Sequence, residues 1–217
     1  MIPATGYYLR LIVYRQAVLA PVLAYLCLVA IIYANPAGPP LSPGSITAVA
    51  LMPLTAWLVR LTATCESAPF AEITLTVLGG PLRRQAARLA ATLAVTVALG
   101  VVAVVWGSLA NPEPYLTPTV VTLLGMHAAE ACAGAGVGIL LSPPLRVRVG
   151  TAVTVVTVVT LASLVVPWLP PLNPLLRAVY IRDWPGPGLL LAVIGQAWLV
   201  GLAGVLASVA LIRNRAG

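Results

Sequence analysis

The sequence predicts an all-α integral membrane protein, and composition and hydrophobic pattern both support this. Of the 217 residues, 60% are hydrophobic and 8% are charged, and the mean hydropathy is +1.02. A soluble protein of this size would have too little polar surface to cover such a chain. Apolar stretches long enough to cross about 30 Å of hydrocarbon follow one another along the sequence. We therefore expect residues 1–217 to form a single transmembrane domain.

Six apolar stretches have the length and composition of membrane-spanning helices. They are Gln16–Ala34, Ser45–Leu61, Ala87–Leu109, Thr119–Leu141, Gly150–Trp168 and Gly188–Ile212. The proline-rich segments between them that we expect to be non-helical are Asn35–Gly44, Ala110–Pro118 and Leu169–Pro187. No small-residue cleavage site closes the first stretch, so we expect it to be retained as a span.

The positions of the arginines predict the orientation in the membrane. All twelve basic residues are arginine, and if the proline-rich segments lie outside, ten fall on the cytoplasmic side and only Arg177 and Arg182 lie outside. The positive-inside rule then places both termini in the cytoplasm. The arginines stand singly or in pairs and form no basic stripe, so nucleic acid is not an expected partner. The composition, rich in Ala, Val and Arg, is typical of a high-GC bacterium, which indicates a multi-pass protein of the inner (plasma) membrane.

The connector Thr62–Gln85, after the second span, is expected to contain a short cytoplasmic helix. Ser67 and Pro69 give a start signal, and Gly79 opens a Gly-Gly-Pro stop signal. Between these signals, three apolar residues recur at helical spacing: Phe70, Ile73 and Val77. Because this helix is too short to span a membrane, its apolar face must rest on lipid or on a partner.

A second short helix, interfacial or re-entrant, is expected outside, between the fifth and sixth spans. Asn173 followed by Pro174 is a helix start, and the apolar face that follows includes Tyr180 beside Arg177 and Arg182. An irregular proline-rich loop is the alternative for this segment.

Polar residues within the predicted spans are few. His127 and Glu130 lie three residues apart near the middle of the fourth span and share a helical face. A charged carboxylate at this depth costs about 2.5–3.5 kcal/mol, which favours a position facing a cavity, a partner helix or a substrate path. A neutral Glu130 that is hydrogen-bonded to His127 or to a neighbouring helix is the other interpretation, and both stay open. Gln196, in the last span, is interpreted as an interhelical hydrogen bond.

Several enzyme classes are excluded by the residues available. Without any lysine, the chain cannot form a phosphate-binding loop of the Gly-Lys-Ser type, so ATP would have to be hydrolysed by another chain. Gly134, Gly136 and Gly138 lie inside an apolar span and are interpreted as sites of close helix packing. One histidine with one glutamate falls short of a zinc motif, and no serine has a nucleophile elbow. We therefore expect no enzyme activity and no metal or cofactor on this chain.

The predicted layout resembles the ABC-2 type exporter permeases. The stretch Leu78–Gln85, running into the span from Ala87, is similar to the family's junction between coupling helix and third span. The resemblance implies that a separate ATPase subunit, which carries ATP and Mg, docks on the coupling helix, and that Gly6–Tyr14 is an elbow helix. It also implies a role in transmitting force for Glu66, Phe70, Glu72, Ile73 and Val77.

The resemblance further implies that the chain forms half of a translocation path, which an identical or homologous second permease subunit completes. The outer segment would then act as a gate, through Asn173, Arg177, Tyr180 and Arg182. The expected activity is export of an amphipathic, lipid-like or drug-like substrate.

Three other functions are left open by the sequence. A proton-coupled secondary transporter would use His127 and Glu130 as its relay. A membrane enzyme of lipid metabolism is less favoured, because the five acidic residues are scattered. A structural anchor for a larger complex would show no cargo-dependent activity.

Overall fold

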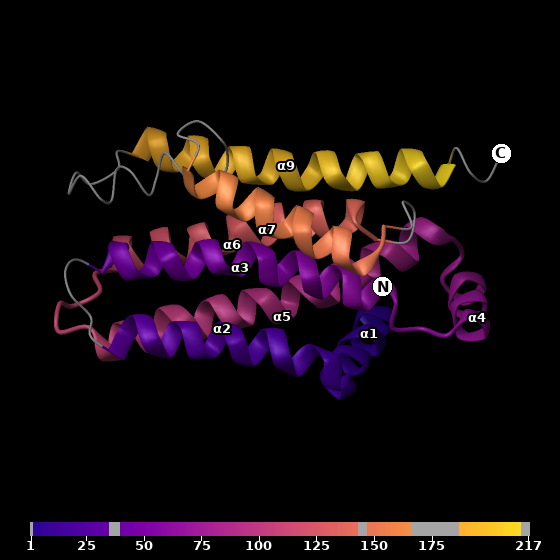
Figure 1. The fold of residues 1–217 in the computed structure, drawn as a ribbon, viewed down its shortest axis with the longest axis horizontal. Helices are drawn as coiled ribbons and strands as arrows, with labels where there is room; N and C mark the ends of the chain where they lie inside the picture. Colours follow the sequence, from indigo (N-terminus) through magenta and orange to yellow (C-terminus); the bar gives the residue numbers. More distant parts are fainter. Residues whose placement is uncertain (1, 35–39, 143–146, 166–186, 214–217) are drawn as a thin grey trace.

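The computed structural model describes residues 2–34, 40–142, 147–165 and 187–213, and every regular element within these ranges is an α-helix. In chain order the helices are α1 (Ile2–Tyr14), α2 (Gln16–Ala34), α3 (Leu41–Ala63), α4 (Ala68–Leu78), α5 (Pro81–Ala110), α6 (Thr117–Leu140), α7 (Val149–Val165) and α9 (Pro187–Arg213). The long helices run side by side, α4 lies beyond them at one end of the bundle, and the connector between α5 and α6 lies at the other end (Figure 1).

Five of these helices are long and apolar enough to cross a membrane: α2, α3, α5, α6 and α9. Helix α7 is also apolar but has 17 residues. The prediction of an all-α membrane protein is therefore confirmed in its coarse form. The predicted outer helix with Asn173, Arg177, Tyr180 and Arg182 lies outside the described residues.

Three helix starts differ from the expected ones. Helix α3 begins at Leu41, so the prediction that residues 41–44 are non-helical was wrong. Pro43 is tolerated there because a helix makes no use of backbone N–H groups in its first turn. Helix α5 begins at Pro81 and includes the arginines that precede Ala87, and α6 begins at Thr117 with a proline in its first turn.

The short helix α4 has the predicted ends. Ser67 is its extended N-cap residue, and Gly79 ends it in the left-handed conformation, with φ 70°. The Gly80 N–H donates to the Leu75 carbonyl over 3.1 Å. This 6→1 hydrogen bond is characteristic of the Schellman motif that ends many helices. Gly80 also has a positive φ, of 137°, and α5 begins at the next residue. Two glycines therefore make the whole link between α4 and α5.

Helix α6 lies at the centre of the bundle, packed on α3 and α9. In the most apolar 18-residue segment of α6, 72% of the residues are buried. In the corresponding segments of α2 and α9, 22% of the residues are buried in each. A side chain in the middle of α6 is therefore surrounded by protein, whereas much of α2 and α9 faces outward.

Glycines on α6 allow this close packing. A Cβ on Gly138 would lie 2.5 Å from the Ala56 carbonyl oxygen of α3. On the opposite face, a Cβ on Gly136 would lie 2.7 Å from the Val200 carbonyl oxygen of α9. The interpretation of these glycines as packing residues is confirmed.

Arginines bind carbonyl groups at the end of the bundle that carries α4. Arg15 donates to the Leu61 carbonyl, in the last turn of α3, over 2.7 Å. Arg60 donates to the Leu141 carbonyl at the end of α6 and, over 2.6 Å, to the Val147 carbonyl just before α7. The Leu61 and Leu141 carbonyls lie at the C-terminal ends of α3 and α6, so both arginines place a cation at the negative end of a helix dipole.

The glycine contact is tested by comparing two Gly→Ala substitutions. Gly138→Ala should lower the free energy of unfolding by about 1–3 kcal/mol, because the new methyl group meets backbone of α3 that cannot rotate away. Gly195→Ala in α9 places its Cβ in open space and should be neutral or stabilising, by up to about 1 kcal/mol. Thermal unfolding in mild detergent measures both effects. Equal midpoints for the two variants would contradict this account of the α3–α6 contact.

Candidate functional site

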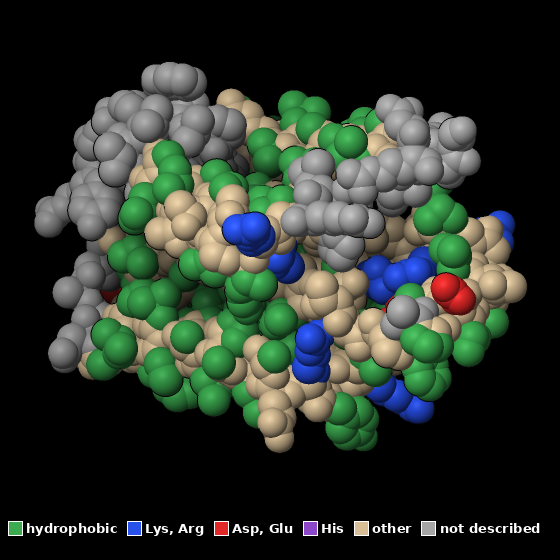
Figure 2. Space-filling model, turned by 45° about the vertical axis from the view of Figure 1, so that its right-hand side comes forward, with side chains coloured by type: hydrophobic (Ala, Val, Ile, Leu, Met, Phe, Trp, Pro, Cys, Tyr) green, Lys and Arg blue, Asp and Glu red, His purple; other side chains and the backbone are tan. Residues whose placement is uncertain are grey.

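Helix α4 presents the predicted apolar face to its surroundings. The side chains of Phe70, Ile73 and Val77 are 61%, 59% and 77% exposed. Glu72 is also exposed on this helix. The arginine side chains visible in Figure 2 lie from the middle of the molecule to the end that carries α4. An exposed apolar face on a helix outside the bundle is a feature of docking surfaces.

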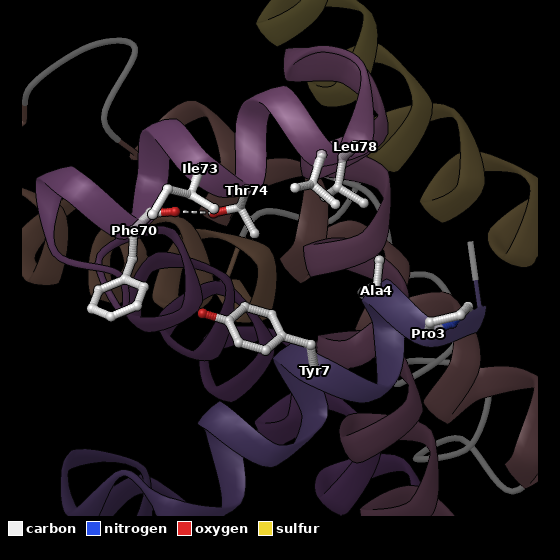
Figure 3. A pocket seen from close by; sticks show the side chains of 8 residues that line it. Pro3, Ala4, Tyr7, Phe70, Ile73, Thr74 and Leu78 are labelled. Carbon is white, nitrogen blue, oxygen red and sulfur yellow. Dashed lines mark hydrogen bonds between the residues drawn. The ribbon is translucent and has the colours of Figure 1, made fainter.

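An apolar groove separates α4 from α1. Its volume is about 370 Å³, and Pro3, Ala4 and Tyr7 of α1 line one side. Phe70, Ile73, Thr74, Val77 and Leu78 of α4 line the other. Figure 3 shows the Tyr7 ring extending from α1 toward α4, with the Phe70 ring beside the same space. The groove therefore extends the exposed face of α4 onto α1.

A buried carboxylate fastens α4 to α5. The Glu66 side chain, just before α4, is 1% exposed, and its Oε2 lies 2.6 Å from Arg88 Nη2 and 3.3 Å from Arg84 Nε. The Thr74 hydroxyl of α4 donates to Glu66 Oε1 over 2.9 Å. Arg84 also donates to the Ala71 carbonyl of α4 over 3.1 Å. We refer to Glu66, Thr74, Arg84 and Arg88 as the anchor cluster.

Helix α1 joins the anchor cluster through an aromatic ring. The Arg88 guanidinium carbon lies 5.3 Å from the centroid of the Tyr8 ring, and Tyr8 is fully buried. This is the distance of a cation–π contact. Burial raises the pKa of Tyr8 to about 12, so the phenol is neutral near pH 7. The cluster therefore holds α1, α4 and α5 together.

The expected coupling residues thus divide into two groups. Phe70, Ile73, Val77 and Glu72 lie exposed on α4, where a partner could reach them. Glu66 is buried, so a docked partner could not contact its carboxylate unless the anchor cluster opened. Sequence reasoning missed Arg84, Arg88 and Tyr8. The available signal was the spacing of Arg84 and Arg88, four residues apart on one helical face.

The polar residues expected in the spans do not form one site. The His127 Nδ1–H donates to the Leu123 carbonyl over 2.7 Å, and Nε2 lies 3.2 Å from the Thr47 hydroxyl of α3. Glu130 is 1% exposed, and its Oε1 has no hydrogen-bond partner among the described residues. Gln196 is exposed on α9 and makes no hydrogen bond to the described part of another helix, so its role as an interhelical hydrogen bond stays a prediction.

The anchor cluster is tested by removing its carboxylate. Glu66→Ala leaves two arginines without their counterion, one of them buried, and should lower the free energy of unfolding by about 3 kcal/mol. Glu72→Ala, at an exposed position of α4, is the matched control and should change it by less than about 0.5 kcal/mol. Thermal unfolding in detergent measures both. A Glu66→Ala protein as stable as the control would show that the cluster does not hold α4.

Comparison with family models, with curated proteins and with solved structures found no match to this chain. The resemblance to ABC-2 permeases therefore rests on the predicted layout alone.

Proposed function

We propose that this chain is the permease subunit of an ATP-binding-cassette transporter of the ABC-2 type. The observation that carries the proposal is the state of α4, a short helix outside the bundle whose apolar face is exposed while its other side is fixed by buried charges. A helix that only covered the bundle would bury its apolar face. An attached helix with an outward apolar face is suited to bind a separate protein.

The proposal takes α2, α3, α5, α6, α7 and α9 as six spans with both termini in the cytoplasm. The described part of α7 would extend about 25 Å at 1.5 Å per residue, close to the thickness of the hydrocarbon core. Helix α4 and ten of the twelve arginines would then lie on the cytoplasmic side, where an ATPase subunit with its ATP and Mg would be located. The host membrane would be a bacterial inner membrane.

The proposed coupling runs from α4 to α5 through the anchor cluster. When ATP closes the motor, displacement of α4 would pull on Arg84 and Arg88, which lie on α5. The link of two glycines is too short to absorb a large displacement. Helix α5 packs on α3 and α6, so its tilt would reach the centre of the bundle. For this movement to drive transport, nucleotide must stabilise the conformation with α5 tilted more than the conformation without the tilt.

The remaining parts of the proposal follow from the family layout. A second permease subunit, identical or homologous, would complete the path, and the outer segment with Asn173 and Arg177 would gate it. The cargo would be amphipathic, lipid-like or drug-like and would move outward.

Co-purification tests the proposal at its central point. The tagged chain, taken from its native membrane in mild detergent, should bring down a nucleotide-binding subunit in stoichiometric amount. Ile73→Asp should weaken this association at least about tenfold, or about 1.4 kcal/mol, because docking would bury a carboxylate in an apolar contact.

Thr76→Asp is the matched control, because it adds the same charge at an exposed position of α4 away from the apolar face. It should retain the ATPase subunit. Equal recovery of the ATPase with Ile73→Asp and with wild type would exclude α4 as the docking helix.

A proton-coupled secondary transporter is the second candidate. The observation in its favour is Glu130, a carboxyl group buried in the central helix whose Oε1 has no partner among the described residues. Transport in vesicles without ATP, abolished by Glu130→Gln, would support this function over the first.

A further inference from the structure

An apolar groove lies between α5 and α9 and reaches the central helix α6. Its volume is about 180 Å³. Leu89 and Leu93 of α5 line one side, and a face of α9 from Trp198 to Val205 lines the other. Cys132 and Ala135 of α6, which packs on both of these helices, line the groove between them. The groove is therefore a place where the central helix can be reached from the side of the bundle.

The groove lies within membrane-spanning segments, toward the end of the bundle that carries α4. Helices α5, α6 and α9 are all long and apolar enough to cross a membrane. Leu89 lies about 12 Å along α5 from the start of that helix. Val205 likewise lies about 12 Å from the last residue of α9, and both of these helix ends are at the α4 end of the bundle (Figure 1). The two walls are thus at the same depth, in the hydrocarbon of one leaflet.

The size of the groove matches a single hydrocarbon chain. From Trp198 to Val205 the groove extends about 10 Å along α9, about two-thirds of the depth of one leaflet in a hydrocarbon core about 30 Å thick. Carbon atoms in contact lie about 4 Å apart, so a chain of methylene groups of this length occupies roughly 160 Å³. An α-helix is about 10 Å across and over the same length occupies roughly 800 Å³. The groove has room for the chain and not for a helix.

The surroundings of the groove favour a lipid chain as its occupant. Trp198 and Leu202 line the groove and are each 55% exposed, so the α9 wall is continuous with the surface that this helix presents to the bilayer. In lipid, van der Waals contact decides which groups associate, because exclusion of water contributes nothing. A chain in the groove contacts three helices, whereas a chain on the outer face of α9 contacts one. A lipid chain that enters sideways is therefore held more tightly than its neighbours in the bilayer.

We infer that the groove between α5 and α9 binds one acyl chain of a phospholipid from the leaflet on the α4 side of the membrane. The bound chain lies against Cys132 and Ala135 and completes the packing of α6 at this level. This inference does not depend on the proposed docking function.

Photolabelling with a phospholipid that carries a diazirine in one acyl chain tests the inference. The full-length protein in mild detergent receives an equimolar amount of phosphatidylethanolamine modified in this way, and peptide mass spectrometry maps the attachment site. Cys132 and Ala135 are 8% and 5% exposed, so a lipid can label α6 here only by entering the groove. The wild type should carry label on α6 between Cys132 and Ala135, and excess unmodified phosphatidylethanolamine should remove it.

Two variants narrow the groove and one serves as the matched control. Ala135→Leu and Leu202→Trp should each reduce labelling of α6 at least about tenfold, because the added atoms take the space of the chain. Ala94→Leu adds the same atoms as Ala135→Leu at an exposed position of α5 that does not line the groove, and it should leave the labelling unchanged. Should Ala135→Leu not fold, Leu202→Trp decides the test.

Three results overturn the inference. The first is a wild type that takes no label between Cys132 and Ala135, which is also the result expected if a second copy of the chain covers the groove. The second is full labelling of α6 in the folded groove variants. The third is a loss of labelling in Ala94→Leu as complete as that in Leu202→Trp.

Discussion

The fold depends on how closely α6 approaches its neighbours. In lipid, apolar burial gives helices no reason to associate, so contact at van der Waals distance and hydrogen bonds must hold them together. Gly138 lets α6 touch the backbone of α3, and Gly136 does the same toward α9. The result encloses the middle of α6 in protein, and His127 and Glu130 are therefore buried among helices and kept away from lipid. The glycine contacts thus make it feasible for polar groups to lie at this depth.

Helix α4 is attached by a different kind of interaction. Its exposed side is apolar, and charges in the anchor cluster hold the other side to α5. A buried ion pair adds little net stability to the folded protein. Removal of one of its two partners is nevertheless costly, because the remaining buried charge is left without a partner. Such an attachment fixes orientation more than it adds stability. It fixes α4 to α5 while the apolar face of α4 stays exposed.

The sequence predicted what local signals determine. The ends of α4 follow from Ser67, Pro69 and the two glycines, all within or beside the helix, and the prediction matched the structure. The start of α5 was placed six residues late, because its arginines lower the hydropathy although they favour a helix. The burial of Glu66 depends on contacts with a separate helix, α5. No spacing within one helix contains that information.

Two physical reasons act together to place described arginines toward the end of the bundle that carries α4. Insertion retains positive charge on the cytoplasmic side, which is the basis of the predicted orientation. Independently, helices α3 and α6 end at this side of the bundle and need donors for their last carbonyls, which Arg15 and Arg60 supply. Arg84 and Arg88 are neutralised by Glu66, whereas Arg10, Arg83 and Arg148 remain exposed. These exposed cations suit a surface with anionic headgroups, so some of the arginines that predict the orientation are paired within the protein and others remain at its surface.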